Sequence, residues 1–160
     1  MRASVIQLKQ VVFQRIVVNA PEPMEGSAPP EVAGFDFDGV QFQVALDAQP
    51  VPGKEGEATT NFVVALSVGI DQAEGKPVPY QVDVAALGLV EVAEVVEPAK
   101  RRDLALVNGA SLVYGAIREL ITTLTGRCVA GPLVLPTADF RDHSEIVSPP
   151  VVQGPPGADI

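Results

Sequence analysis

The sequence predicts an α+β domain in which an antiparallel β-sheet packs against one long α-helix. Two observations support this fold class: four segments with strand character come first along the chain, and one amphipathic helix follows them. Short turns join the last three strand segments, and parallel neighbours would need longer crossovers. Strands followed by a helix in this way indicate a sheet with its helical layer on one side.

The first strand is expected over Val5–Val18, where apolar residues occupy both odd and even positions. Side chains alternate between the faces of a strand, so both faces of this one should be covered. One face would carry Val11, Phe13 and Val17, and the other Val12, Ile16 and Val18. Residues 19–34 hold four prolines and two glycines, which is the composition of a loop. This loop is long for a hairpin, so we expect it to cross from one side of the sheet to the other.

Three further strands are expected over Phe35–Asp47, Asn61–Ile70 and Gln81–Val96. The first of the three alternates between apolar and polar residues, which predicts one solvated face. Its apolar positions are Val40, Phe42, Val44 and Leu46. Gly88 lies inside the longest strand and predicts a bulge or a bend there.

The clearest helix lies between Asn108 and Gly126. Its apolar residues recur at the spacing of one helix face: Leu112, Val113, Ala116, Ile117, Leu120, Ile121 and Leu124. Asn108 can act as N-cap, and Gly126 offers the left-handed residue that closes the last turn. Pro132 and Pro136 interrupt the apolar segment Arg127–Phe140, so it should pack in an extended form without continuing the helix.

Charge and composition limit the possible functions. The 20 acidic and 11 basic residues give a net charge of -9, which argues against nucleic acid and anionic lipid as partners. We expect no membrane insertion, because no apolar run reaches spanning length. One cysteine, Cys128, fits a reducing compartment, so we expect a cytoplasmic protein. Hydrophobic residues make up 47% of the chain, and such apolar surface must lie between subunits or be used for binding.

We predict that the chain is not an enzyme and holds no metal or cofactor. Cys128 and His143 provide no zinc ligand set at a recognised spacing, and a helix C-terminus before Cys128 disfavours its thiolate. Asp36 and Asp38 share a strand face, where a solvated edge is a simpler interpretation than an acid pair. The glycine-rich turn at residues 53–56 lacks the paired lysine and hydroxyl of a phosphate loop, because Glu55 follows Lys54. A small enzyme with a cavity on a curved sheet would need a pair of polar residues inside an apolar pocket. The sequence shows no such pair.

The polar side of the helix carries four candidates for an oligomer interface: Ser111, Gly115, Arg118 and Glu119. Ser111 and Gly115 are small enough to let another helix approach. Arg118 and Glu119 are adjacent and point in different directions, so we expect them to make separate contacts. A solvated helix face is the alternative interpretation.

Three patches of the sequence resemble the SecB family of bacterial export chaperones. The run Tyr114–Ile121 resembles the family's aromatic-Pro-x-x-Arg-Glu-x-Ile helix, with Gly115 in place of the proline. The residues that follow, Arg127, Leu133, Leu135 and Phe140, resemble the segment after that helix. Phe13–Ile16 resembles the family's first strand, and Tyr80–Leu89 its long strand. The resemblance depends on the order and spacing of these patches.

The resemblance implies a SecB-like domain over residues 1–141, with a four-stranded antiparallel sheet and one long helix packed on it. The family's second helix is expected to be short or missing, because residues 141–148 are polar and prolines follow them. Residues 142–160 would then be a flexible tail rich in proline and glycine. In the family, strands pair across a dimer and long helices lie between two dimers, which implies a homo-tetramer.

The resemblance also implies an ATP-independent chaperone that binds unfolded or non-native polypeptides, with protein export as its role. Phe35 and Tyr80 fall at or near aromatic positions of the family's client groove, and Phe42 and Val82 are grouped with them as client-binding candidates. Ordinary core filling is the alternative for Phe35 and Tyr80. Capture of a client would depend on burial of its apolar side chains and on backbone pairing at a strand edge.

Asp83 matches an acidic residue on the strand face with which the family docks the export motor SecA. Its acidic companions are missing, because Ala20 and Met24 stand at their positions, with Glu22 and Glu25 only nearby. Two alternatives to an export chaperone therefore stay open. One is a chaperone dedicated to a single protein, such as that of a toxin–antitoxin pair. The other is an oligomeric scaffold without clients.

Overall fold

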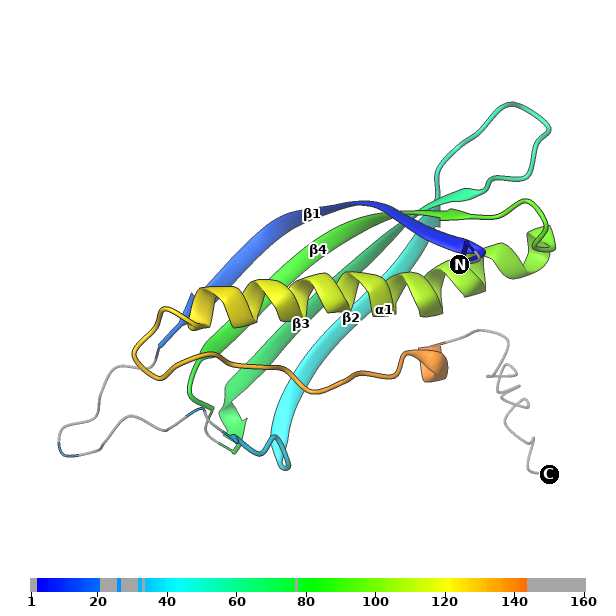
Figure 1. The fold of residues 1–160 in the computed structure, drawn as a ribbon. Helices are drawn as coiled ribbons and strands as arrows, with labels where there is room; N and C mark the ends of the chain where they lie inside the picture. The colour runs from blue at the N-terminus through cyan, green and yellow to red at the C-terminus, as the bar shows by residue number, and fades with distance from the viewer. Residues whose placement is uncertain (1–2, 21–25, 27–31, 33, 77, 144–160) are drawn as a thin grey trace, which may run out of the picture.

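A four-stranded antiparallel sheet with one long helix lying across it forms the described part of the chain (Figure 1). The computed structural model describes residues 3–20, 26, 32, 34–76 and 78–143. Its strands are β1 (Ile6–Asn19), β2 (Val40–Pro50), β3 (Asn61–Gly75) and β4 (Gln81–Val92). They are followed by α1 (Pro98–Thr125) and a short 3-10 turn, Arg141–His143. The α+β prediction is confirmed, and most of the predicted tail, residues 144–160, lies outside the described residues.

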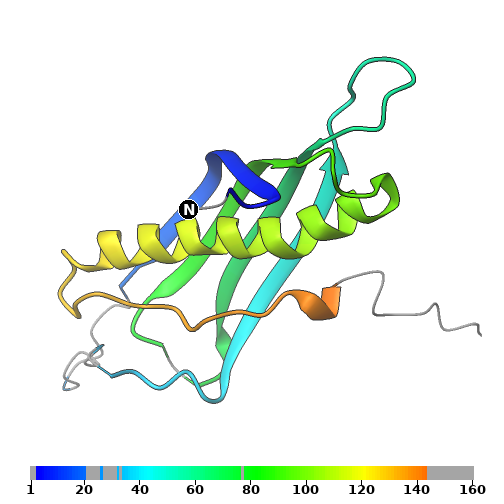
Figure 2. The ribbon, with the colours of Figure 1, turned by 45° about the vertical axis from the view of Figure 1, so that its right-hand side comes forward.

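The order of strands in the sheet is β1-β4-β3-β2. β1 and β2 are thus at opposite edges, so the chain between them crosses from one edge to the other, as the length of the loop predicted. β2, β3 and β4 form the predicted antiparallel meander. α1 and the chain after it lie on the same face of the sheet in both views (Figures 1 and 2). We call the other face of the sheet the open face.

The predicted faces of β1 are wrong beyond Phe13. The pairing with β4 shifts between Phe13 and Arg15, and an extra residue at a bulge exchanges the two faces of a strand. Ile16 therefore points to the α1 side and Val17 to the open face, the reverse of the prediction. Val12 and Ile16 are 48% and 46% exposed, so the described chain does not cover both faces of β1.

β2 begins at Val40, later than predicted, and Phe35 and Phe37 precede it. Gly34 and Gly39 adopt φ of 73° and 81°, a left-handed conformation that breaks an extended strand and that glycine adopts at little cost. The polar turn after β2 is followed by β3, which continues to Gly75. The alternation of side chains along β2 and β3 was thus predicted correctly, but the start of β2 was not.

Gly88 makes a regular pair with Val11 on one side and with Val64 on the other, so the predicted bulge is absent there. A Cβ atom at this position would lie 2.3 Å from Cγ2 of Val113 on α1. Glycine therefore lets the helix approach β4 closely, and the irregularities of this pair of strands lie in β1 instead.

α1 begins at Pro98, well before the predicted N-cap Asn108. Proline suits the first turn of a helix because its missing N–H would have had no partner there. Asn108 lies inside the helix, where its amide donates to the Leu104 carbonyl. Gly126 does end the helix, but with φ of -58° rather than the left-handed conformation predicted. The glycine that adopts the left-handed conformation after the helix is Gly131, with φ of 87°.

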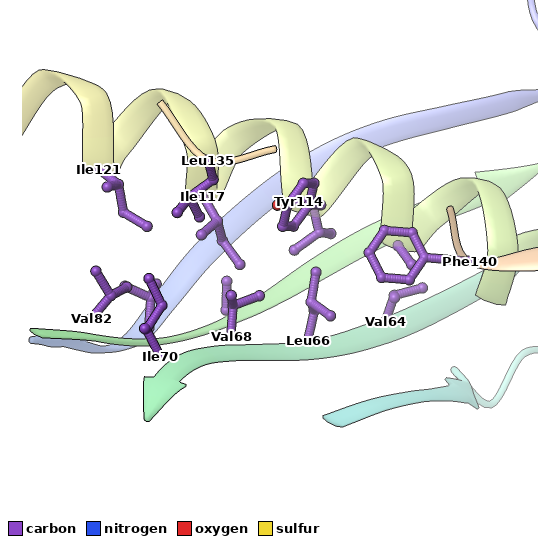
Figure 3. Packing of buried hydrophobic residues seen from close by; sticks show 14 of the residues in the cluster. Val64, Leu66, Val68, Ile70, Val82, Tyr114, Ile117, Ile121, Leu135 and Phe140 are labelled. Atoms are coloured by element: carbon purple, nitrogen blue, oxygen red, sulfur yellow. The ribbon is translucent and has the colours of Figure 1, made fainter. Parts of the chain in front are cut away.

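The core lies between α1 and the two central strands (Figure 3). Val113, Ile117 and Ile121 of α1 are fully buried, and the opposing side chains come from β3 and β4: Val64, Leu66, Val68, Ile70 and Val82. Leu112 and Leu124 stay 40% and 41% exposed, so the apolar face predicted for the helix is wider than the surface the sheet covers.

α1 is long and apolar enough to pass for a membrane span, with a mean hydropathy of 1.3 over its most apolar window. The sequence prediction that no segment reaches this length overlooked the helical turns before Asn108. Because one face of α1 is buried against the sheet, packing in the core accounts for its apolar residues.

Arg101 is a buried cation whose role the sequence did not reveal. Its guanidinium donates to the carbonyls of Val96 and Glu94 at 2.8 and 2.9 Å, and to those of Ala58 and Thr59 at 3.2 and 3.3 Å. One side chain thus fastens the first turn of α1 to the chain before the helix and to the turn between β2 and β3. Four carbonyl partners compensate for the desolvation of the cation.

Candidate functional site

The candidate site is an apolar hollow between the chain that enters β2 and the chain that leaves α1. Its volume is about 300 Å³, and we call it the aromatic hollow. Its lining residues are Val32, Gly34, Phe35, Phe37, Pro132, Leu133 and Val134. Segments far apart in sequence meet here, namely the crossover to β2 and the start of the chain that runs back alongside α1.

The rings that line the hollow form a continuous aromatic group. Phe35 and Phe37 lie edge to face with their ring centroids 5.0 Å apart, and Phe37 lies 5.8 Å from Phe42 of β2. The ammonium of Lys76 is 5.0 Å from the centroid of the Phe35 ring, within the range of a cation–π contact. Two of the predicted client-binding residues, Phe35 and Phe42, are thus joined through Phe37.

The other two predicted client-binding residues lie elsewhere. Tyr80 and Val82 are fully buried between the sheet, α1 and the chain after it. The Tyr80 hydroxyl donates to the Gly131 carbonyl at 2.7 Å, and burial raises the pKa of this phenol. Both side chains fill the core, which is the alternative the sequence left open for Tyr80. Neither presents a surface to a client in this structure.

Residues 127–140, the post-helix segment, form one wall of the hollow. Leu133 and Leu135 are fully buried, and Phe140 nearly so, which confirms the prediction of an extended packed segment. Hydroxyl and guanidinium groups of α1 bind its backbone. Thr122, Tyr114 and Arg118 donate to the carbonyls of Leu133, Pro136 and Leu135, and Thr125 accepts from the Leu133 amide.

These side chains replace the ladder bonds that a strand would supply. A buried backbone group without a partner is costly, so the hydroxyls hold the wall of the hollow in a defined position. The sequence signal for this attachment is the set of hydroxyl groups on α1, Thr122 and Thr125 in particular. It was missed because hydroxyl groups on a helix follow no pattern that names their partner.

Two apolar side chains near the end of α1 are exposed, and one of them, Val134, lines the hollow. Val134 is 54% exposed and Val129 is 82% exposed, and both belong to the post-helix segment. Apolar side chains that gather in the open beside a hollow mark surfaces at which proteins bind other molecules. No sequence pattern identifies either valine as a surface residue.

Asp83 lies on the open face, away from the hollow. Arg15 forms a two-pronged ion pair with it, with distances of 2.7 Å from Nε to Oδ2 and 2.8 Å from Nη2 to Oδ1. Asp83 and Arg15 are both partly exposed, and the pair leaves little net charge at this position. The acidic surface that the resemblance implies is therefore compensated here by a cation of the same sheet.

The four candidates for the oligomer interface divide into two groups. Ser111, Gly115 and Glu119 are exposed on α1, and a Cβ atom at Gly115 would meet no atom within 4 Å. Arg118 instead donates from Nε to the Leu135 carbonyl at 2.8 Å, so it binds the post-helix segment of its own chain. The remaining three share an uncovered strip of the helix.

Among the residues that the structure describes, no group of three or more His, Cys, Asp or Glu could hold a metal ion. Cys128 is exposed and has a free thiol, and His143 lies against the ring of Phe140. The site therefore consists of apolar surface and hydrogen-bonded backbone, an arrangement suited to binding an apolar side chain of another molecule.

Fold and site together define an α+β protein of one sheet and one helix, with an aromatic hollow beside the helix end. No protein-family model matches the sequence. The chain is 27% identical over 128 residues to the protein-export protein SecB of Anaplasma phagocytophilum, with 76% of this chain and 77% of that protein covered. The chain is therefore similar in sequence to a SecB protein.

A solved structure shares the fold. A SecB-like chaperone of Mycobacterium tuberculosis, in complex with a ChAD peptide from the HigA1 antitoxin, superposes with a TM-score of 0.51 at 19% identity. The alignment covers 84% of this chain and 90% of that one. The predicted sheet with one long helix is therefore the fold of a known SecB-like protein.

Proposed function

We propose that this chain is a SecB-like molecular chaperone of the cytoplasm, which binds non-native polypeptides at the aromatic hollow and uses no ATP. One observation supports this above all. The hollow places Phe35 and Phe37 against Pro132 and Val134 at the surface, with apolar side chains left exposed beside it. The SecB relative named for protein export and the structural relative solved with a peptide both agree with this function.

The chemistry of binding is the transfer of apolar client side chains from water into the hollow. Burial of one Leu or Phe side chain contributes about 1.5–3 kcal/mol, and a hollow of about 300 Å³ admits a single residue of that size with room to spare. Such contacts are weak singly, so a client needs several hollows or several contacts. A homo-tetramer, with Ser111, Gly115 and Glu119 in its helix interface, would supply more than one hollow per particle.

A dedicated chaperone of a toxin–antitoxin pair is the second candidate. Arg15 neutralises Asp83, so the residue proposed to dock SecA lacks a free charge, which favours a protein with one client over a partner of the export motor. The structural relative, in complex with an antitoxin peptide, agrees with this version of the function.

The function can be tested by measuring how the chain suppresses aggregation of an unfolded, reduced client without nucleotide. Phe35→Ala should weaken suppression severalfold, because it removes one wall of the hollow, and Val134→Asp should do the same by placing a charge on its rim. Val95→Asp is the matched control, since Val95 is an exposed valine outside the hollow. Equal loss in all three variants, or no suppression by the wild type, would contradict the proposal.

Binding measured over a panel of client proteins distinguishes a general export chaperone from a chaperone dedicated to one client. A general export chaperone should suppress aggregation of several unrelated unfolded proteins with similar potency. A dedicated chaperone should bind one antitoxin-type peptide at least tenfold more tightly than the others. Isothermal titration with Asp83→Asn and with Arg15→Gln, using purified SecA as ligand, then tests the role of Asp83 directly.

A further inference from the structure

The two walls of the aromatic hollow are held in place in different ways. The post-helix segment forms one wall, and buried hydroxyl groups such as that of Thr125 fix its backbone. The opposite wall is formed by residues 34–39, which we call the aromatic wall because they carry Phe35 and Phe37. Both rings are only partly buried, so packing holds them less firmly than it holds the fully buried Leu133.

The aromatic wall begins and ends at Gly34 and Gly39, the two glycines with left-handed backbone. Within it, the Asp36 carboxylate accepts a hydrogen bond from the Asp38 amide at 2.9 Å. Such a bond between near neighbours shapes a turn. It does not fix that turn against the rest of the sheet, so a contact from another element is needed for that purpose.

Lys76, which directly follows β3, makes contacts of this kind. Its ammonium lies 5.0 Å from the centroid of the Phe35 ring and donates to the Asp36 carbonyl at 2.6 Å. Its backbone amide donates to the Gly39 carbonyl at 3.1 Å. One residue thus fastens both ends of the aromatic wall to the end of β3.

The contacts of Lys76 with the ring and with the carbonyl contribute more than its ion pair. The Asp36 carboxylate lies 3.7 Å from the ammonium and its side chain is 73% exposed, so water screens this pair. A hydrogen bond from an ammonium to a carbonyl is stronger than one between neutral groups, and a cation is attracted to the face of an aromatic ring. The positive charge of Lys76 therefore acts on the ring and the backbone of the aromatic wall.

We propose that Lys76 is a positioning residue of the aromatic hollow, which holds the Phe35 ring in the orientation that an apolar client side chain meets. Lys76 does not itself line the hollow, so it acts through Phe35. This inference rests on the proposed function. A side chain that must be ordered on binding costs free energy, and a ring that is already held avoids that cost, so loss of the cation should weaken client binding about threefold to tenfold.

Binding of a permanently unfolded protein, reduced and carboxymethylated α-lactalbumin, tests the role of the charge. Lys76→Met removes the ammonium and keeps an unbranched side chain, so it should raise the dissociation constant by the factor given above. Lys76→Arg keeps a cation for the ring and should stay within about twofold of the wild type. Lys100→Met is the matched control, since Lys100 is an exposed lysine paired with Glu97 on α1. Equal weakening in Lys76→Met and Lys100→Met, or no rescue by Lys76→Arg, would overturn the proposal.

A double-variant cycle with Phe35→Leu tests whether Lys76 acts through the ring. In the Phe35→Leu background there is no ring to hold, so Lys76→Met should have little further effect on the dissociation constant. Full additivity of the two changes would mean that Lys76 contacts the client directly or acts elsewhere. That result would overturn the positioning role. Circular dichroism checks that each variant folds.

Fluorine NMR of the full chain without client separates this inference from the proposed function. All six phenylalanines are replaced by para-fluorophenylalanine, and the Phe35→Leu variant identifies the Phe35 signal by its absence. Lys76→Met should move this signal toward its position in the unfolded chain, whereas Lys100→Met should leave it in place. A Phe35 signal that does not respond to Lys76→Met would overturn the inference, whether or not the client binds. If the signal moves but the wild type binds no client, the contact is confirmed and its role in binding is overturned together with the proposed function.

Discussion

The two faces of the same sheet differ in what covers them, although both are rich in apolar residues. On β4, Val82, Val84, Val90 and Val92 point toward α1 and are fully buried, whereas Leu87 and Leu89 point to the open face and are only partly buried. The alternation of the strand assigns each residue to a face. What covers that face depends on partners further along the chain or on another molecule.

This difference predicts unequal costs for similar truncations on the two faces. Ile117→Ala on the covered side should lower the free energy of unfolding by about 2–5 kcal/mol, because it opens a cavity in a core that cannot fill it. Ile117 is fully buried between α1 and the sheet. Leu87→Ala on the open face should cost less, about 1 kcal/mol, since part of its surface already meets water and its loss leaves no closed cavity. Chemical denaturation at low protein concentration measures both, and equal costs would contradict the comparison.

A second prediction concerns how closely α1 approaches β4. Gly88→Ala should destabilise the protein by about 1–3 kcal/mol, because overpacking forces neighbouring groups apart and the new Cβ would lie 2.3 Å from Val113 Cγ2. Gly69→Ala on the same sheet is the control, since its nearest contact would be an ordinary 3.6 Å.

The double variant Gly88→Ala/Val113→Ala sharpens this test. Val113→Ala removes the methyl group that meets the new side chain, so the cost of Gly88→Ala measured in that background should fall. An additive double variant would mean that the clash is relieved elsewhere, by movement of α1 or of Leu8, whose Cδ1 would lie 3.3 Å from the new Cβ.

The sequence predicted the covered face well because local patterns determine it. The alternation of β3 and β4 and the spacing of Val113, Ile117 and Ile121 each identify buried residues without knowledge of their partners. The start of α1 was predicted wrongly because Asn108 is a good N-cap residue, whereas the helix begins at Pro98 through contacts that Arg101 makes with distant carbonyls. Such tertiary contacts leave no periodic signal.

The candidate site was predicted only in part, because tertiary contacts decide which of its residues reach the surface. Phe35 and Phe42 lie at the aromatic hollow, but the sequence could not show that the post-helix segment would cover Tyr80 and Val82. That covering depends on long-range hydrogen bonds from Tyr80 and Tyr114 to backbone carbonyls. The bulge in β1 was missed because one inserted residue changes the face without changing the composition of the strand.

A third prediction tests the attachment of the post-helix segment. Tyr80→Phe should cost about 1 kcal/mol, the usual contribution of a hydrogen bond, because the Gly131 carbonyl loses its donor. Burial, and secondarily the nearby Cys128, raise the pKa of Tyr80 in the folded state. The neutral phenol is thus favoured by folding, and its contribution is complete below the unfolded pKa of about 10 and is lost as pH rises beyond it.

The measurement is the free energy of unfolding of wild type and Tyr80→Phe between pH 8 and about pH 11. The variant should lose less stability than the wild type over the upper part of this range. Tyr114→Phe removes the α1 hydroxyl that donates to the Pro136 carbonyl of the same segment, and it should change the pH profile in the same direction, because burial also raises the pKa of Tyr114. A wild type and variant with parallel pH profiles would show that the Tyr80 proton is not linked to folding.

The smallest effect is expected on the open face. Arg15→Gln should lower the free energy of unfolding of the separate chain by less than about 1 kcal/mol, since ion pairs in contact with water contribute little and both partners here are partly exposed. A double-variant cycle with Asp83→Asn, measured at low and high salt, isolates the pair. A coupling well above this value, and insensitive to salt, would mean that the pair is shielded from water even in the separate chain. In that case the open face would be covered within the separate chain, and the two faces of the sheet would not differ in the way described above.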